Sequence, residues 1–239
     1  MPGVSAEPAI RTEAVGAPAI SIIVPALNES AEIHESLAAL QCYRASGHQV
    51  ILVDGGSRDG TPERALGLSD LTLVAERGRA AQMNAGAAVA TGGVLLFLHA
   101  DTRLPAGAGA LIQSGLRRAP WGRFDVRIAG RHPLLRCIGF MMSLRSRITG
   151  IATGDQAIFV RRDLFEAVGG YAAIPLMEDI ELCTRLRRLA QPVCLKARVT
   201  TSGRRWESRG VLRTTLLMWG LRLGFALGVA PEALAKRYR

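Results

Sequence analysis

The sequence predicts an α/β fold, with a mostly parallel sheet covered by helices on both faces. Four short apolar runs without internal charges are typical of buried parallel strands: residues 20–24, 50–53, 71–74 and 94–98. Each run is followed by a helical pattern, at 31–40, from near Thr61, at 80–90 and at 106–118. This alternation predicts a Rossmann-like arrangement, in which ligands bind beyond the carboxyl ends of the strands.

The second half of the chain alternates less regularly. Its pattern predicts strands at 124–128 and 156–160, helices at 134–148, 178–189 and 211–227, and a polar loop at 200–210. The helix at 178–189 begins with acidic residues and ends with arginines, which suits the helix dipole.

Positive charge is concentrated at the C-terminal end. The net charge is +10, and residues 185–239 contain 13 of the 30 Lys and Arg but only two of the 20 acidic residues. Such a segment can face phosphates, anionic lipid or nucleic acid, or can simply be a solvated surface. Aromatic residues make up only 5% and no nucleic-acid motif occurs, so we expect no nucleic-acid partner.

The cysteines and the apolar segments bear on location. None of the four cysteines forms a C-x-x-C pair, so they are interpreted as small buried residues in a reducing compartment. Arg213 and Arg222 interrupt the most apolar segment, 211–230, which argues against a membrane span. We therefore expect a cytoplasmic protein, either free or peripheral at the inner face of the membrane. The apolar faces predicted at 134–148 and 211–227 fit an anionic membrane surface, a homodimer interface or ordinary core helices.

Polar residues gather where three predicted strands end. Asp54 ends the second strand, and its carboxylate can accept hydrogen bonds from a nucleobase or a ribose. Gly55 lets the backbone approach a ligand closely, and Ser57 and Asp59 add polar groups. A plain turn rich in Gly, Asp and Ser would look similar.

Asp101 ends the fourth strand and is the candidate metal ligand. Mg²⁺ usually binds one or two protein carboxylates together with substrate phosphates. His99 would lie on the same face and can be a second ligand, more readily of Mn²⁺, or a structural hydrogen-bonding group. Asp101 can alternatively cap the helix that follows.

Two further clusters carry candidate chemistry. Glu178 and Asp179 lie at a predicted helix N-terminus, where a carboxylate can act as a general base or can simply complement the helix dipole. Arg204, Arg205 and Trp206 can hold phosphates and wall a pocket, or can belong to the general basic tail.

Seven motifs in order resemble family 2 glycosyltransferases of the GT-A fold. They are Ser21-Ile-Ile-Val-Pro-Ala-Leu-Asn-Glu29, Val53-Asp-Gly-Gly-Ser-Arg-Asp-Gly-Thr61, Gly78-Arg-Ala-Ala-Gln-Met-Asn-Ala-Gly86, Leu98-His-Ala-Asp-Thr102, Gly154-Asp-Gln156, Met177-Glu-Asp179 and Arg204-Arg-Trp206. The His-Ala-Asp, Gly-Asp-Gln and Arg-Arg-Trp variants look most like a small bacterial subgroup labelled arsenosugar-biosynthesis glycosyltransferase.

The resemblance implies inverting sugar transfer from a nucleotide-diphosphate sugar to an acceptor hydroxyl, with Mn²⁺ or Mg²⁺ as cofactor. It implies nucleotide or diphosphate contacts from Pro25, Asn28, Glu29, Asp54, Gly55, Ser57, Asp59, Arg79, Asn84, Arg205 and Trp206. Asp101 would match the metal aspartate, Asp179 the catalytic base beside Glu178, and Asp155 and Gln156 the acceptor side. His99 replaces the first aspartate of the D-x-D motif, and Ser202 replaces the Gln of the Q-x-x-R-W motif.

The resemblance also implies a domain organisation. A GT-A domain would span 20–209, with a nucleotide half at 20–103 and an acceptor half at 104–209. A flexible lead-in at 1–19 would precede it, and a basic amphipathic C-terminal helix at 210–239 would follow. The alternatives are a nucleotidyltransferase on the same fold and a non-catalytic module that binds a membrane surface.

Overall fold

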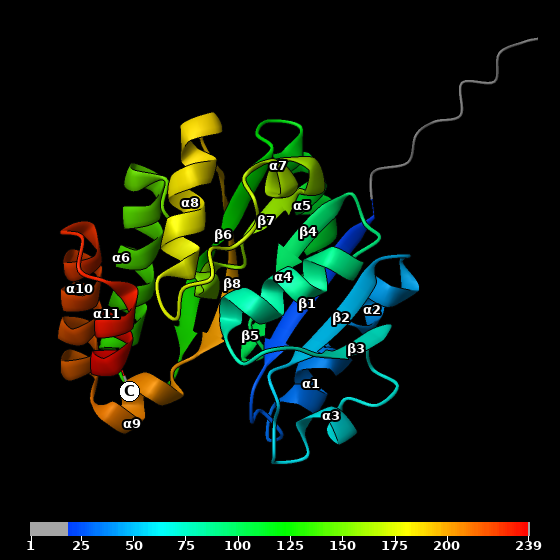
Figure 1. Cartoon of the computed structure of the whole chain (residues 1–239), viewed down its shortest axis with the longest axis horizontal. Coiled ribbons are helices and arrows are strands. Elements are labelled where there is room, and N and C mark those ends of the chain that lie inside the picture. The colour runs from blue at the N-terminus through cyan, green and yellow to red at the C-terminus, as the bar shows by residue number, and fades with distance from the viewer. Residues whose placement is uncertain (1–18, 239) are drawn as a thin grey trace, which may run out of the picture.

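The computed structural model describes residues 19–238, in which a curled eight-stranded mixed sheet has helices on both faces (Figure 1). The predicted lead-in lies outside the described residues except for Ala19. The strand order is β3-β2-β1-β4-β7-β6-β8-β5. The strands are β1 Ile20–Ala26, β2 Gln49–Asp54, β3 Leu71–Val74, β4 Val94–Phe97, β5 Thr102–Arg103, β6 Trp121–Ala129, β7 Phe159–Arg161 and β8 Val193–Ser202.

The first four strands are parallel, as predicted. In register, Ile23 of β1 lies between Ile51 of β2 and Phe97 of β4, and all three side chains are buried. Burying such a side chain contributes ~1.5–3 kcal/mol, which explains why these charge-free runs form the centre of the sheet. The short strand β7 pairs antiparallel with both β4 and β6 and so joins the two halves.

Helices cover both faces of the sheet. The helices are α1 Ile33–Ala38, α2 Gln41–Ala45, α3 Thr61–Arg64, α4 Arg79–Val89, α5 Ala108–Leu116, α6 Leu134–Thr149, the 3-10 helix η1 Gly154–Gln156, α7 Arg162–Ala167, α8 Glu178–Leu189, α9 Arg204–Arg209, α10 Val211–Ala226 and α11 Pro231–Tyr238. Leu37 of α1 and Ile112 of α5 pack in one core cluster, and Met83 of α4 and Leu182 of α8 pack in the other. The sheet is therefore buried on both sides, which explains its nearly unbroken apolar strands.

Three sequence predictions in the second half need correction. Residues 156–160 are not one strand, because Ala157 has a left-handed φ of 47° and the strand begins only at Phe159. Residues 200–210 are not a loop, because β8 runs to Ser202 and α9 begins at Arg204. The cysteines are not uniformly buried: Cys183 is buried, but Cys42 and Cys137 are exposed.

The C-terminal segment is a helical hairpin rather than one helix. Helix α10 ends at Ala226, and Gly228, with φ 83°, allows the chain to reverse into α11. Leu234 of α11 and Leu221 of α10 pack together against Leu176 and Met177, just before α8. Helices α6, α8, α10 and α11 consequently gather at one end of the molecule (Figure 1).

No helix between residues 19 and 238 is both long enough and apolar enough to cross a bilayer.

Candidate active site

The carboxyl ends of the parallel strands bring the predicted nucleotide-binding residues together. Ala26 at the end of β1 is in register with Asp54 at the end of β2, and the amide of Gly55 donates to the carbonyl of Ala26 at 2.9 Å. The segment 25–29 therefore lies beside the turn 54–59, as the strand order predicts.

Asp54 stabilises the turn that follows it through hydrogen bonds. Its carboxylate accepts hydrogen bonds from the amides of Gly56 at 2.9 Å and Ser57 at 2.8 Å, and from the Ser57 hydroxyl. The residue is only 2% exposed. Asp54 therefore shapes the turn at residues 54–59, on the rim of the site.

Gln82 supports the same rim, and we did not single it out from the sequence. Its Nε2 donates to the carbonyls of Ala26 at 2.7 Å and Val53 at 2.8 Å. A Cβ at Gly55 would lie 3.1 Å from the Gln82 amide, so Gly55 admits this buried amide. The available signal was the position of Gln82 inside the 78–86 motif.

Hydrogen bonds join residues 28–30, after β1, to residues 57–59 of the turn after β2. Asn28, with φ 55°, donates its amide to the Ser57 hydroxyl at 2.8 Å, and its side-chain oxygen accepts from the Arg58 amide at 3.0 Å. Asp59 accepts from the Ser30 amide at 3.0 Å. A hydrogen bond from the Thr61 hydroxyl is the main cause that lowers the pKa of Asp59 to about 2. Residues 28–30 and 57–61 thus form one rigid rim.

Asp101 lies between that rim and β8. Its Oδ1 accepts hydrogen bonds from the hydroxyls of Thr102 at 3.3 Å and Thr201 at 3.5 Å, and its carbonyl accepts from the Ser202 amide at 3.2 Å. Within residues 19–238, no hydrogen bond reaches its Oδ2. Burial and then the charge of Asp101 raise the pKa of Glu29, which places both carboxylates in one electrostatic environment.

The donor set fits a metal held mainly by substrate. Among the described residues, no group of three or more His, Cys, Asp or Glu could hold a metal ion. One carboxylate oxygen at Asp101 without a protein partner suits Mg²⁺ or Mn²⁺, which keep phosphate and water ligands.

His99 faces Asp155. Its Nδ1 lies 3.3 Å from Oδ1 of Asp155, and its other ring nitrogen packs on Gly154, where a Cβ would lie only 2.3 Å away. Burial raises the pKa of Asp155, but the hydrogen bond and charge of His99, together with the charges of Arg79 and Arg205, outweigh burial, so the net pKa is lowered. In this arrangement His99 positions η1.

The first turn of helix α8 contacts η1. Asp179 accepts hydrogen bonds from the Gly154 amide at 2.8 Å and from the Ile180 amide at 2.7 Å. Glu178 is only 6% exposed, and burial, followed by the charge of Asp179, raises its pKa. The candidate base Asp179 is therefore tied through Gly154 to the His99–Asp155 pair.

Three of the predicted residues make structural contacts. Asn84 exchanges two hydrogen bonds with the backbone of Tyr171, at 2.8 and 2.9 Å. Gln156 is buried and donates to the Ser146 hydroxyl at 2.9 Å. Trp206 packs against the cluster of Ile128, Leu135 and Val211. These side chains anchor the elements around the site.

The two predicted phosphate-binding arginines converge. The positive charges of Arg79 and Arg205 both lower the pKa of Asp155, after burial and His99 have acted on it. Partial burial, and then the charge of Arg79, lower the pKa of Arg205 itself. The guanidinium of Arg205 lies 4.6 Å from the centre of the Tyr238 ring in α11, so the C-terminal hairpin helps to place it.

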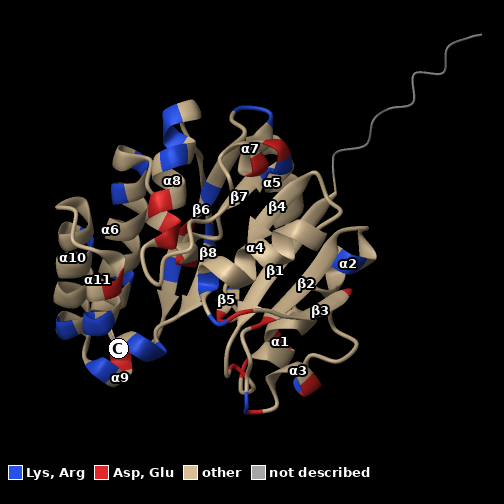
Figure 2. Cartoon of the chain, viewed as in Figure 1, with Lys and Arg blue, Asp and Glu red and all other residues tan. Residues whose placement is uncertain are grey.

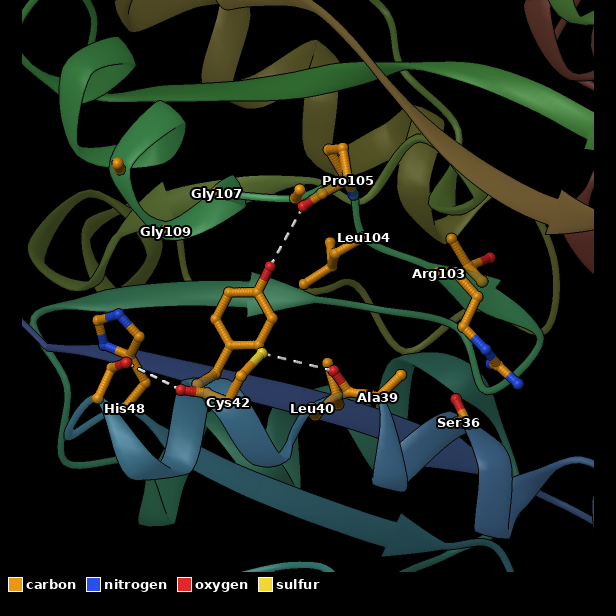
Figure 3. Close-up of a pocket in the computed structure, with 15 residues that line it drawn as sticks. Ser36, Ala39, Leu40, Cys42, His48, Arg103, Leu104, Pro105, Gly107 and Gly109 are labelled. Atoms are coloured by element: carbon orange, nitrogen blue, oxygen red, sulfur yellow. Dashed lines mark hydrogen bonds between the residues drawn. The ribbon is translucent and has the colours of Figure 1, made fainter.

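A cavity of about 580 Å³ lies elsewhere, between α1, α2 and the segment 102–110 (Figure 3). Tyr43 is one of its lining residues, and its hydroxyl donates to the carbonyl of Pro105 at 3.4 Å. None of the predicted site residues lines this cavity. Figure 2 instead shows acidic residues at the start of α8 and near β5, with Lys and Arg along α9 to α11. The convergence of charged groups, not cavity size, locates the candidate active site.

Comparison with known proteins shows which proteins this chain is similar to. Residues 21–118 match the model of the family Glycosyl transferase family 2. A glycosyltransferase of PGL/p-HBAD biosynthesis from Mycobacterium tuberculosis is 35% identical over 176 residues, which cover 66% of this chain and 64% of that protein. The chain spans less than two thirds of the length of the curated relatives it matches, between 31% and 64%.

Solved structures share the fold. The mannosyltransferase PcManGT from Pyrobaculum calidifontis, in complex with GDP-Man and Mn²⁺, superposes with a TM-score of 0.64 at 22% identity, covering 92% of this chain and 69% of that one. TarS from S. aureus, in complex with UDP-GlcNAc, gives a TM-score of 0.61 at 18% identity, covering 77% of this chain and 58% of that one. The expected GT-A fold is confirmed, and the family match with the relatives supports a family 2 glycosyltransferase.

Proposed function

We propose that this protein transfers a sugar from a nucleotide-diphosphate sugar to an acceptor hydroxyl, with inversion at the anomeric carbon. The proposal rests on the placement of two carboxylates, Asp101 and Asp179. They lie around the linked residues His99, Gly154 and Asp155. Within residues 19–238, the Oδ2 of Asp101 accepts no hydrogen bond, and Asp179 is held by the Gly154 amide. The family match and the sugar-transferring relatives support the reaction class.

The nucleotide-diphosphate sugar would lie along the rim formed by residues 28–30 and 57–61. Residues 25–29 and the 54–59 turn would hold the nucleotide, while Arg79 and Arg205 would face the diphosphate. Asp101 would hold Mn²⁺ or Mg²⁺, which when bound offsets the charge that develops on the departing diphosphate. The solved relatives with GDP-Man and Mn²⁺ and with UDP-GlcNAc are consistent with this placement.

Asp179 would act as the general base in a single displacement. The acceptor oxygen forms a bond to the anomeric carbon as the bond from that carbon to the diphosphate oxygen breaks, and the hydroxyl proton passes to Asp179. One displacement inverts the configuration. Arg205 would stabilise the negative charge of the leaving group electrostatically.

The products separate this proposal from its alternative. Incubation with a panel of UDP- and GDP-sugars should release nucleoside diphosphate, whereas a nucleotidyltransferase would release pyrophosphate. Pyrophosphate as the product would overturn the proposal. Membership of the arsenosugar-type subgroup stays a prediction from the motif variants.

Helix α10 supports a peripheral membrane location as part of the same proposal. It exposes a stripe of five large apolar side chains, Leu212, Leu216, Trp219, Leu223 and Leu227, each 61–75% exposed. The stripe follows helical spacing, and basic residues lie on the neighbouring α9 and α11 (Figure 2). An apolar face flanked by positive charge favours binding to an anionic membrane surface. A homodimer is the alternative, and vesicle flotation together with light scattering distinguishes the two.

A further inference from the structure

Two arginines from different helices meet next to the candidate base. Arg145 lies near the end of α6, and Arg222 lies in α10 directly after Leu221, which packs against Met177 at the start of α8. Figure 1 shows α6, α8 and α10 gathered at the same end of the sheet. Both arginines interact electrostatically with Asp179.

Both arginines are half-buried, and part of each guanidinium group is shielded from solvent without a hydrogen-bond partner in residues 19–238. The Nε and Nη2 of Arg145 and the Nη1 of Arg222 are shielded from solvent and donate no hydrogen bond to any residue in the described range. Neither arginine forms an ion pair with residues 19–238. Burial, and then the positive charge of Arg222, lower the pKa of Arg145 to about 10. Buried donors without acceptors are costly, so the fold keeps this pair at the expense of stability.

Asp179 attracts both arginines electrostatically, but no carboxylate within residues 19–238 forms an ion pair with either of them. Elsewhere on the same helix, Arg147 contacts Asp125 at 2.6 Å, and Asp125 also pairs with Arg123. By contrast, the carboxylate of Asp179 is held by the amides of Gly154 and Ile180. The pair therefore has unused donors for a negatively charged group that is not part of the described chain.

We propose that Arg145 and Arg222 bind an oxyanion of the acceptor, a phosphate or a carboxylate, beside Asp179. The acceptor is thus an anionic molecule, held by its charged group while the reacting hydroxyl faces the base. Guanidinium groups suit this role because they contact phosphate and carboxylate oxygens with two parallel hydrogen bonds. This inference deepens the proposed function and rests on it.

Binding of inorganic phosphate tests the inference directly. The protein is first saturated with nucleoside diphosphate and Mn²⁺, which fills the donor site, and phosphate is then titrated by calorimetry at constant ionic strength. Arg145→Gln and Arg222→Gln should each weaken phosphate binding by about 10-fold or more, because each removes a charged hydrogen-bond donor. Arg136→Gln on α6 and Arg213→Gln on α10, both exposed arginines, are the matched controls and should bind phosphate as the wild type does. Equal binding in all five proteins would overturn the inference.

Thermal stability separates a binding role from a structural one. Without phosphate, Arg145→Gln and Arg222→Gln should melt at or above the wild-type temperature, because each removes an unpaired buried charge. A lower melting temperature, together with unchanged phosphate affinity, would mean that the arginines only support the fold. The first step, saturation with nucleoside diphosphate, tests the proposed function by itself. The proposed function and the inference about the two arginines can therefore fail independently.

Transfer assays identify the source of the oxyanion. With the donor sugar that the protein accepts, a soluble sugar phosphate and a short prenyl phosphate in detergent are offered beside a neutral sugar. Transfer to either phosphorylated acceptor that falls about 10-fold in Arg145→Gln supports the inference and names the source. A neutral sugar used equally well by the wild type and Arg145→Gln, with no transfer to the anions, would overturn it.

Discussion

The backbone amide of Gly154 donates a 2.8 Å hydrogen bond to the carboxylate of Asp179. The same glycine packs against His99, whose other ring nitrogen faces Asp155. Gly154 therefore links the candidate base to the residue that replaces the first aspartate of the D-x-D motif. In this chain, η1 connects His99, just after β4, to the first turn of α8.

Gly154→Ala should impair this link. Its Cβ would lie 2.3 Å from the His99 ring, which is too close for any real contact, so η1 or His99 must shift. We expect turnover to fall by at least about 10-fold while nucleoside diphosphate binding changes little, because misplacing a reacting group by ~1 Å can cost ~10²-fold. Gly220→Ala in α10 is the control, since nothing lies within 4 Å of its added Cβ. Wild-type turnover in Gly154→Ala would refute the link.

Asp179→Asn should abolish proton transfer without disturbing the donor site. Gly154 and Ile180 donate to different oxygens of Asp179, so the amide oxygen of Asn can keep one of these hydrogen bonds, but the side chain cannot take up a proton. Turnover is expected to fall by ~10²–10⁴-fold, with nucleoside diphosphate affinity nearly unchanged. Initial rates and calorimetry on the same preparation measure both. A variant that turns over at close to the wild-type rate would remove Asp179 from the mechanism.

Glu178 should make stability depend on pH in a defined direction. Burial raises its pKa in the folded state, so the folded protein binds this proton more tightly than the unfolded chain. Stability is thus highest below the unfolded pKa of about 4.5 and falls as pH rises towards the folded value. Glu178→Gln should melt higher than the wild type at pH 7 to 8, and the difference should shrink towards pH 4.5. A difference that grows on acidification would contradict the shift.

The apolar stripe of α10 should govern vesicle binding. Leu216→Glu and Trp219→Glu place a negative charge on the surface that would face anionic lipid, so flotation with phosphatidylglycerol vesicles should fall strongly. Leu66→Glu is the matched control, because Leu66 is equally exposed, at 78%, but lies after α3. Loss of a dimer in light scattering, with no vesicle binding by the wild type, would instead favour the homodimer.

The nucleotide half was predictable because its signals are local. Charge-free strands such as 50–53 and the Gly-rich turn after Asp54 are read from neighbouring residues, and α8 begins at Glu178 as predicted. The strand β8 was missed because Lys196 and Arg198 interrupt its apolar pattern, although its pairing with β6 buries Val199. The partners of Asn84 and His99 could not be predicted, because each contact joins segments far apart in the chain.

The binding of nucleoside diphosphate to Asp101→Ala tests the central claim most directly. Calorimetry with UDP and with GDP, each with and without Mn²⁺, would compare this variant with the wild type. Equal melting temperatures of the two proteins would show that the variant is folded. The account predicts metal-dependent binding of one nucleotide by the wild type and a loss of that metal dependence in Asp101→Ala. Equal affinity in both proteins, with and without Mn²⁺, would contradict the account.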